Sequence, residues 1–304
     1  MSNSFYHQDI VTVQDFSREQ IELILDTAER LKHSPIYHLL KDKVVATCFF
    51  EASTRTRLSF EAAVYRLGGN VIGFADGGNT SLGKKGESLE DTIRMVECYS
   101  DAIIIRHPDI GSAQIAADTS SKPVINAGDG ANQHPTQTLL DLFTIREHFN
   151  QIDGLKIAML GDLKYGRTVH SLAKALVNYN VEVIFCPQTG FEMPESICQI
   201  LDEHKMTYYT NNNLPEVLES ANVIYMTRCQ KERLSENEKE IDKIILTATL
   251  LKKHALSDAC VMHPLPRVDE IDVSVDKTPY AKYFQQAGNG LYVRQAILKL
   301  LLCK

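Results

Sequence analysis

The chain has 304 residues, more than the roughly 150 of a typical single domain, so two domains with a cleft between them are expected. Its 44% hydrophobic and 23% charged residues are ordinary for a folded globular protein and exclude a disordered or fibrous chain. The 32 basic and 39 acidic residues give a formal net charge of -7, which offers no broad positive field to attract nucleic acid or an anionic membrane.

The same features predict a cytoplasmic protein without a disulfide framework or a structural zinc site. No apolar run approaches the ~20 residues that a membrane span needs, and residues 1–10 lack the basic and apolar regions of a signal peptide. The seven cysteines form no C-x-x-C pair and their number is odd, so neither a disulfide framework nor a structural zinc site is expected. We interpret all seven thiols as structural.

Short apolar runs alternate with helical periods from Val44 onward, a pattern typical of parallel sheets covered by helices on both faces. The runs are nearly all apolar, as strands buried on both faces should be. The predicted strands are residues 44–50, 71–74, 102–105, 124–126, 156–160, 181–186, 223–226 and 260–262. We therefore predict an α/β fold with two doubly wound parallel-sheet domains and the active site in the cleft between them.

The predicted helices divide the chain into these domains. Ser88 followed by Asp91 resembles a capping box and predicts a helix that runs to Tyr99. Residues 136–149 predict one long helix, after which we place the domain junction. The apolar tail from Gly290 predicts a last helix. The expected domains are 1–149, joined by the C-terminal helix 286–304, and 150–285; residues 76–86, rich in Gly, Ser and Lys, are predicted to form a mobile loop.

Polar side chains follow most of the predicted strands, at the edge where an open parallel sheet binds ligands. In the first half these residues are Glu51, Ser53, Thr54, Arg55, Thr56, Arg106, His107, His134 and Gln137. In the second half they are Asp162, Lys164, Arg167, Arg228, Gln230, His263, Pro264 and Pro266. Cations and hydrogen-bond donors are therefore expected to gather at one edge of each sheet.

The segment 53–56 stands where a strand turns into a helix, so free backbone N–H groups, hydroxyls and a guanidinium could meet one anion. The alternative is a helix cap beside a surface arginine. Arg106 and His134 are weak signals alone, but with Thr56 they are donor types that stabilise an oxygen becoming negative in a tetrahedral transition state. This chemistry requires no nucleophilic side chain.

The segment 161–168, GDLKYGRT, differs from a nucleotide-binding P-loop only by Arg167 in place of lysine. Arginine does not replace the compact lysine of that loop, and no strand-terminal aspartate suited to magnesium is evident. We instead interpret Arg167 and Arg228 as two planar forks for the carboxylates of a dicarboxylate ligand.

Four segments carry a resemblance to a known family. Residues 49–57 (FFEASTRTR) resemble the carbamoyl phosphate signature of the aspartate/ornithine carbamoyltransferases. Residues 126–137 (NAGDGANQHPTQ), 161–167 (GDLKYGR) and 263–270 (HPLPRVDE) resemble further blocks of the aspartate-specific branch. The similarity runs from about Asp9 to the C-terminus, so it covers nearly the whole chain.

The resemblance implies transfer of a carbamoyl group from carbamoyl phosphate to L-aspartate, in an order with carbamoyl phosphate first, followed by domain closure. It implies that no metal or organic cofactor is needed. It implies a catalytic homotrimer in which Ser81 and Lys85 reach the active site of the neighbouring subunit, where Lys85 also contacts aspartate. It implies closure through Glu51, Arg167 and Arg233, and a cis proline in the pair Leu265 and Pro266 that orients the amine. The residues implied to hold carbamoyl phosphate are Ser53, Thr54, Arg55, Thr56, Arg106, His134, Gln137, Leu265 and Pro266, of which Arg55, Thr56, Arg106 and His134 are catalytic; those implied to hold aspartate are Arg167, Arg228 and Gln230.

Two alternatives remain open at this point. An ornithine carbamoyltransferase shares the phosphate signature but typically has His-Cys-Leu-Pro where this sequence has His263-Pro264-Leu265-Pro266. An inactive scaffold of a pyrimidine-pathway complex should have lost donors that are present here. Regulatory chains in a larger assembly are a further open point, because residues 109–114 and Lys239 depart from the pattern of the regulated enzymes, which favours trimers alone.

Overall fold

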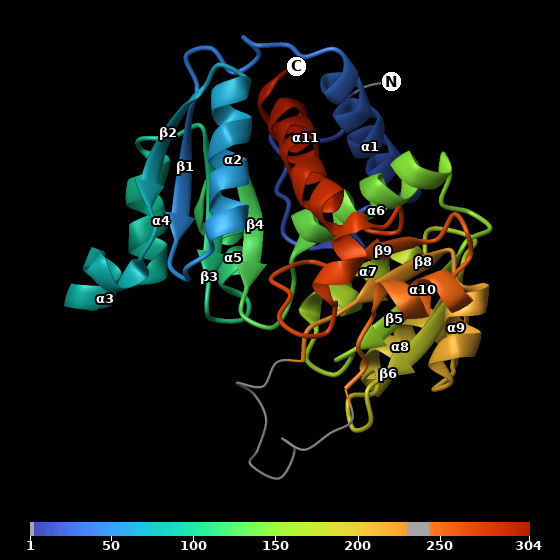
Figure 1. Ribbon diagram of the computed structural model, residues 1–304. Helices are drawn as coiled ribbons and strands as arrows, with labels where there is room; N and C mark the ends of the chain where they lie inside the picture. The colour runs from blue at the N-terminus through green and yellow to red at the C-terminus, as the bar shows by residue number, and fades with distance from the viewer. Residues whose placement is uncertain (1–2, 230–242) are drawn as a thin grey trace. The chain divides into compact units, whose positions relative to one another are not determined.

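The computed structural model describes residues 3–229 and 243–304 (Figure 1). Its internal contacts divide the chain into two compact units. Unit 1 comprises Met1–Phe143 with Gly288–Lys304, and unit 2 comprises Thr144–Ala287. Within the described ranges, no helix is both long and apolar enough to cross a membrane.

Unit 1 is built on a four-stranded parallel sheet with the strand order β2-β1-β3-β4. The strands are β1 (Val44–Phe49), β2 (Asn70–Phe74), β3 (Ala102–His107) and β4 (Val124–Asp129). The strands β3 and β4 are buried along their whole length and β1 along all but its first residue, whereas the edge strand β2 is mostly exposed. The apolar composition of β1, β3 and β4 follows from their burial between two helical layers.

Helices cover both faces of this sheet. Neighbouring residues of a strand point to opposite faces, so Thr47 and Cys48 of β1 show which helices cover each face. On one face Thr47 of β1 donates a hydrogen bond to Glu61 of α2 (Thr54–Arg66) over 3.3 Å. On the other, Cys48 packs with Ile93 of α4 (Leu89–Glu97) and Ala113 of α5 (Ser112–Thr119). Unit 1 is therefore doubly wound. Its other elements are η1 (Val13–Asp15), α1 (Arg18–His33), η2 (Gly77–Asn79) and α3 (Ser81–Lys85), and parts of α6 (Pro135–Phe149) and α11 (Tyr283–Leu302).

Unit 2 is built on a five-stranded parallel sheet with the order β7-β6-β5-β8-β9. The strands are β5 (Lys156–Gly161), β6 (Glu182–Pro187), β7 (Thr207–Thr210), β8 (Val223–Met226) and β9 (Cys260–Met262). The helices are α7 (Arg167–Leu176), α8 (Glu195–Glu203), α9 (Leu214–Ser220) and α10 (Ala248–His254), with η5 (Val273–Lys277).

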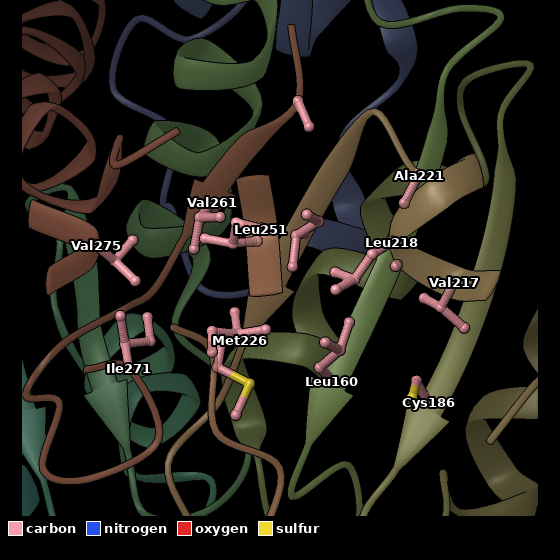
Figure 2. Packing of buried hydrophobic residues seen from close by; sticks show 14 of the residues in the cluster. Leu160, Cys186, Val217, Leu218, Ala221, Met226, Leu251, Val261, Ile271 and Val275 are labelled. Carbon is pink, nitrogen blue, oxygen red and sulfur yellow. The ribbon is translucent and has the colours of Figure 1, made fainter. Parts of the chain in front are cut away.

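The hydrophobic core of unit 2 lies where these strands meet α9 and α10. Figure 2 shows Leu160, Met226 and Val261 from three strands facing Leu218 of α9 and Leu251 of α10. All of these side chains are at most 1% exposed. Burying a side chain of this size stabilises the fold by roughly 1.5–3 kcal/mol. The cluster therefore stabilises the strands from whose carboxyl ends the polar loops begin.

All the strands predicted from the sequence are present, and among residues 3–229 and 243–304 one further strand was missed. The missed strand is β7, whose sequence TYYT is largely exposed at the edge of the sheet and therefore shows no apolar run. The predicted start of α4 is confirmed, because the Ser88 hydroxyl accepts a hydrogen bond from the Asp91 N–H over 3.0 Å. The predicted start of the last helix at Gly290 is wrong, since α11 begins at Tyr283.

The prediction of a loop at residues 76–86 is also wrong in part. The segment folds into η2 and α3, whose N-cap residues are Asp76 and Thr80. The Asp76 side chain accepts a hydrogen bond from the Gly78 N–H (2.9 Å), and the Thr80 hydroxyl accepts one from the Gly83 N–H (3.3 Å). A side chain at Gly83 would place its Cβ 2.4 Å from the Gly77 carbonyl oxygen. Gly83 therefore allows α3 to approach the backbone of η2 closely. The sequence analysis had interpreted the glycines of this segment as a sign of flexibility.

Cys48, Cys186 and Cys260 lie in strands and are buried, as expected for structural thiols. All three are at most 1% exposed. Burial raises the pKa of Cys48 and Cys260 to about 12 and that of Cys186 to about 11. Thiols with these pKa values carry almost no thiolate at neutral pH and are poor nucleophiles.

Candidate active site

The carboxyl edge of the sheet in unit 1 brings together the loop after β1 and the end of β3. These strands are neighbours in register, with Phe49 paired to Arg106, and the Phe50 N–H donates to the Arg106 carbonyl oxygen over 2.8 Å. The Arg106 side chain then forms an ion pair with Glu51, with 2.6 Å between Nη2 and Oε2. The parallel register thus fixes the two residues that the sequence placed after separate strands.

The helix α2 begins at this edge with its first turn left open. Ser53 is the N-cap residue in an extended conformation, and within the described chain its hydroxyl makes no capping hydrogen bond. The first N–H groups of a helix have no intrahelical acceptor and carry partial positive charge. Thr54, Arg55 and Thr56 form the first turn, so the start of α2 offers backbone and side-chain donors to an anion.

Two arginines concentrate positive charge beside this helix start. Arg106 is 8% exposed. Burial lowers the pKa of its guanidinium, and the Glu51 carboxylate partly opposes this shift. Partial burial and then the positive charge of Arg106 lower the pKa of Arg55. Arg106 donates Nη1–H to the Ala127 carbonyl oxygen over 3.2 Å, and its Nε has no hydrogen-bond partner among residues 3–229 and 243–304. Two guanidinium groups that repel each other next to a helix N-terminus are stabilised by a bound anion.

The turn between β4 and α6 brings His134 and Gln137 to the same edge of the sheet. The Asp129 carboxylate accepts hydrogen bonds from the Gln133 N–H (3.0 Å) and from Asn126 Nδ2 (3.1 Å), which closes the turn. His134 is 5% exposed directly before Pro135, the first residue of α6, and its carbonyl oxygen accepts from the Gln137 N–H over 3.0 Å. The sequence did not identify Asp129, a buried carboxylate that holds this turn.

In unit 2, the loops after the neighbouring strands β5 and β8 approach each other very closely. Gly161 has a φ of +97°, and a Cβ there would lie 2.6 Å from the Thr227 carbonyl oxygen. The Thr227 hydroxyl donates to the Leu160 carbonyl oxygen over 2.9 Å. Arg167 is the first residue of α7 and Arg228 follows β8 by two residues, so both start from the carboxyl edge of adjacent strands.

The segment after β9 forms a tight turn around a cis peptide bond between Leu265 and Pro266, as the family resemblance implied. The Leu265 N–H donates to Nδ1 of His263 over 2.8 Å. Because Nδ1 accepts, the ring proton of neutral His263 lies on Nε2, which is 2.8 Å from Oε1 of Glu270. Burial lowers the pKa of His263, the Glu270 carboxylate opposes this shift, and the positive charges of Arg267 and Arg228 add to it.

Arg267 lies in the same turn, and the sequence analysis gave it no role. Its Nη2 donates to Asp276 Oδ2 over 2.6 Å and its Nη1 to the Tyr283 hydroxyl over 3.0 Å. The guanidinium also lies 5.2 Å from the centroid of the Tyr283 ring. Arg267 therefore connects the turn to η5 and to the start of α11. In the sequence, the only indication of this role was its position within the segment HPLPRVDE.

Other residues singled out in the sequence are not brought to these edges by the described contacts. Ser81 and Lys85 are exposed on α3, which packs on η2 and α4. Gln230, Arg233 and Lys239 lie outside the described residues. Glu51, which the resemblance placed in an ion-pair set with Arg167 and Arg233, is paired with Arg106 in this structure.

Comparisons with known proteins agree with the resemblance over the whole chain. The family model "Aspartate/ornithine carbamoyltransferase, carbamoyl-P binding domain" matches residues 8–147, and "Aspartate/ornithine carbamoyltransferase, Asp/Orn binding domain" matches residues 153–301. The aspartate carbamoyltransferase catalytic subunit of Chromobacterium violaceum is 56% identical over 299 residues, which are 98% of this chain and 98% of that protein.

Two solved structures show the same fold. Aspartate transcarbamoylase from Trypanosoma cruzi, in complex with carbamoyl phosphate and aspartate, superposes with a TM-score of 0.91 at 35% identity, covering 99% of this chain and 98% of that one. The catalytic subunit of M. jannaschii aspartate transcarbamoylase superposes with a TM-score of 0.88 at 45% identity, covering 96% of this chain and 97% of that one. With both domain models matched in chain order and half of its residues shared with a curated relative, this chain belongs to the aspartate/ornithine carbamoyltransferase family.

Proposed function

We propose that this chain transfers the carbamoyl group of carbamoyl phosphate to the amino group of L-aspartate, with N-carbamoyl-L-aspartate and phosphate as products. The observation that carries the proposal is the convergence of Arg55 and Arg106 at the open N-terminus of α2, which is a site for a phosphorylated ligand. The family supports the choice of ligand, and the Trypanosoma cruzi relative was crystallised with carbamoyl phosphate and aspartate.

In the proposed site, unit 1 binds carbamoyl phosphate. The phosphoryl group accepts hydrogen bonds from the first turn of α2 and from Arg55, and the carbonyl oxygen lies toward Arg106 and His134. Support comes from the register of β1 and β3 and from the turn at Asp129, which bring these donors to one edge. The proposed ligands are Ser53, Thr54, Arg55, Thr56, Arg106, His134 and Gln137, and the family resemblance adds Leu265 and Pro266.

In the proposed reaction, the neutral amine of aspartate attacks the carbonyl carbon of carbamoyl phosphate and forms a C–N bond. The carbonyl oxygen becomes negative in the tetrahedral transition state, where Thr56, Arg106 and His134 stabilise it. The bond between the carbonyl carbon and the bridging oxygen then breaks, and phosphate leaves with the electron pair. The departing phosphate, held by Arg55, accepts the proton that the amine loses, so no side chain needs to act as a base.

Unit 2 is proposed to bind aspartate through the carboxyl edge of β5 and β8. A dicarboxylate requires two cationic groups, and Arg167 and Arg228 are the planar forks that match carboxylates bidentately. Their starting points on adjacent strands support this assignment. Gln230 stays in the proposal as a third contact on sequence grounds alone, and Glu51, Arg167 and Arg233 stay proposed as the residues that hold a closed form.

The proposed assembly is a homotrimer in which Ser81 and Lys85 of one chain complete the site of its neighbour. Their exposure on the short helix α3 supports a contact outside their own chain. A place in pyrimidine biosynthesis and a cytoplasmic location are predictions that accompany the activity. Binding of regulatory chains is left open.

The direct test is to supply the purified chain with carbamoyl phosphate and either L-aspartate or L-ornithine, and to measure phosphate release and carbamoyl-amino acid formation. Turnover with aspartate alone supports the proposal, and turnover with ornithine alone overturns the assignment of Arg167 and Arg228. Absence of turnover with both amines supports the inactive scaffold. The Arg55→Ala variant is the control for contaminating activity.

Site sharing is tested by mixing inactive Lys85→Ala and Arg55→Ala chains under conditions of subunit exchange. In a mixed trimer, one site combines Arg55 from the first variant with Lys85 from the second and is therefore intact. Partial recovery of activity is expected. Mixed trimers without any recovered activity would refute sharing.

A further inference from the structure

The carboxylate of Asp129 holds more than the turn in which it lies. Asp129 is the last residue of β4, is 2% exposed, and its two oxygens accept four hydrogen bonds. The donors are the Gln133 N–H (3.0 Å) and Asn126 Nδ2 (3.1 Å) at Oδ1, and the Gly111 N–H (3.1 Å) and Asn132 Nδ2 (3.0 Å) at Oδ2. All of these donors are uncharged.

An ionised carboxylate is the side-chain group that matches this set of donors. It presents about four acceptor sites and no donor. An asparagine of the same shape has one acceptor oxygen, and its NH2 group would face N–H groups. Burying a charge is costly unless hydrogen bonds compensate for the lost water. The four contacts of Asp129 supply this compensation, and they reach beyond its own turn.

Two of the donors belong to different turns at the carboxyl edge of the sheet. Gln133 lies in the turn that leads from β4 to α6, whereas Gly111 lies in the turn that follows β3. The two turns are in direct contact, because the Gly130 N–H donates to the His107 carbonyl oxygen over 2.9 Å. Asp129 therefore fixes the turn after β4 against the turn after β3.

Regular strand pairing does not extend to this turn. The strands β3 and β4 pair in register up to Ile105 and Asn126, and the register then shifts before His107 pairs with Asp129. An irregularity of this kind leaves part of one strand without its ladder hydrogen bonds. The turn after β4 therefore depends for its position on contacts such as those of Asp129.

This turn carries His134, which is proposed above to stabilise the carbonyl oxygen of carbamoyl phosphate. His134 follows Gln133 directly and is 5% exposed. The second proposed donor, Arg106, is held separately, because it pairs with Phe49 in the sheet and forms an ion pair with Glu51. A shift of the turn would therefore move His134 relative to Arg106. A displacement of about 1 Å in a catalytic geometry can cost about 100-fold in rate.

We propose that Asp129 is a positioning residue that holds His134 at the distance from Arg106 at which both donate to one oxygen. The inference rests on the proposed function and deepens it. Its effect falls on the chemical step rather than on binding, since Arg55 and the start of α2, proposed to hold the phosphoryl group, follow β1 and not β4.

The first variant is Asp129→Asn, which keeps the shape of the side chain and replaces one acceptor oxygen by an NH2 group. The turnover number with carbamoyl phosphate and L-aspartate is expected to fall about 10- to 100-fold, less than the roughly 100- to 1,000-fold loss when an oxyanion donor is removed outright. The dissociation constant for inorganic phosphate, measured by calorimetry, should stay unchanged. An unchanged turnover number, or an equal loss in both measurements, overturns the proposal.

A matched control is Glu97→Gln, at the other end of β4. The Glu97 carboxylate accepts hydrogen bonds from the Ser121 N–H (2.7 Å) and the Ser121 hydroxyl (2.9 Å), so it holds the turn before β4. Both variants should lower the free energy of unfolding in urea. Glu97→Gln should leave the turnover number unchanged, and an equal fall of the turnover number in both variants means that Asp129 acts through stability alone.

A double-mutant cycle tests whether the effect passes through His134. In the His134→Ala background, Asp129→Asn should cause little further fall of the turnover number, because no imidazole remains to be positioned. A merely structural role of Asp129 would give the full additional fall in this background. That result contradicts the proposal.

Asn132→Asp covers the case in which Asp129→Asn does not fold. Asn132 is exposed, and the change replaces a donor to Oδ2 of Asp129 by a second carboxylate. The turnover number should fall about tenfold, the scale of one hydrogen bond to a charged group, and this fall should vanish in the His134→Ala background. An unchanged turnover number overturns the proposal. If the proposed function itself fails, the unmodified chain forms no carbamoyl-aspartate; if only this inference fails, that chain is active and the variants behave as Glu97→Gln does.

Discussion

Replacing His263 by asparagine or by leucine should separate the two contacts that hold the turn after β9. The imidazole accepts the Leu265 N–H at Nδ1 (2.8 Å) and places Nε2 2.8 Å from the Glu270 carboxylate. Asparagine can still accept the N–H two residues further along, as it does in many turns, but its side chain is too short to reach Glu270. Leucine makes neither contact.

The expected losses follow from burial. His263 is 1% and Glu270 is 5% exposed, but Glu270 also accepts hydrogen bonds from the N–H groups of Val268 and Asp269 at 3.2 and 3.1 Å, so it is not left isolated. Removing one contact to a charged group costs about 2 kcal/mol of the free energy of unfolding in His263→Asn. Leaving the Leu265 N–H without its acceptor adds about 1 kcal/mol or more in His263→Leu.

Urea unfolding followed by circular dichroism, at one protein concentration and at pH 7.5, measures both values. The Michaelis constant for aspartate is measured beside it, because a displaced turn should raise it more in the leucine variant. The reasoning is refuted if the leucine variant is as stable as the asparagine variant, since the Leu265 N–H bond would then contribute nothing.

Further predictions follow from the same structure. Because burial lowers the pKa of His263 below its usual 6.5, the unfolded chain binds more protons and stability is lost as pH falls below about 6.5; urea unfolding of His263→Asn at pH 7.5 and 5.5 should show a smaller loss than that of the unmodified chain. Gly161→Ala should destabilise the chain by about 2–4 kcal/mol in the same unfolding assay, because alanine there has both a φ of +97° and a contact of 2.6 Å, and a neutral substitution would contradict this. Arg106→Met should weaken binding of inorganic phosphate about 10- to 100-fold by calorimetry, and unchanged affinity would remove Arg106 from the anion site. A thiol reagent should modify the exposed Cys98 rapidly and Cys48 only on unfolding, as mass spectrometry of the labelled peptides can check.

The sequence predicted the strands well because doubly buried strands are apolar along their whole length. That rule missed β7, which is exposed on the edge of its sheet. The search for apolar patterns also missed the first turns of α11, where Gln286 and Asn289 are each 1% exposed although both are polar. Gln286 is buried because its Oε1 accepts the His263 N–H (2.8 Å), a contact between distant parts of the sequence that no local pattern shows.

The candidate site was predictable to the same extent. Residues that follow strands could be placed at a sheet edge from topology alone, as Arg55, Arg106 and Arg228 were. The residues that hold them could not, because Thr227 acts through a backbone carbonyl of another loop and Asp129 acts through a backbone N–H four residues further along its own turn. Their residue types are common in ordinary turns, so only the folded chain distinguishes them.

Unit 1 is discontinuous in sequence, and this constrains the order in which the protein can form on the ribosome. Its first segment ends at Phe143, all of unit 2 follows, and the remainder begins at Gly288. Nδ2 of Asn3 donates to the carbonyl oxygens of Leu300 and Cys303, so residues about 300 positions apart in the sequence meet in unit 1. Every residue of unit 2 is therefore synthesised before residues Gly288–Lys304 of unit 1. A nascent chain stopped before Gly288 has a complete second unit and a first unit that lacks most of α11.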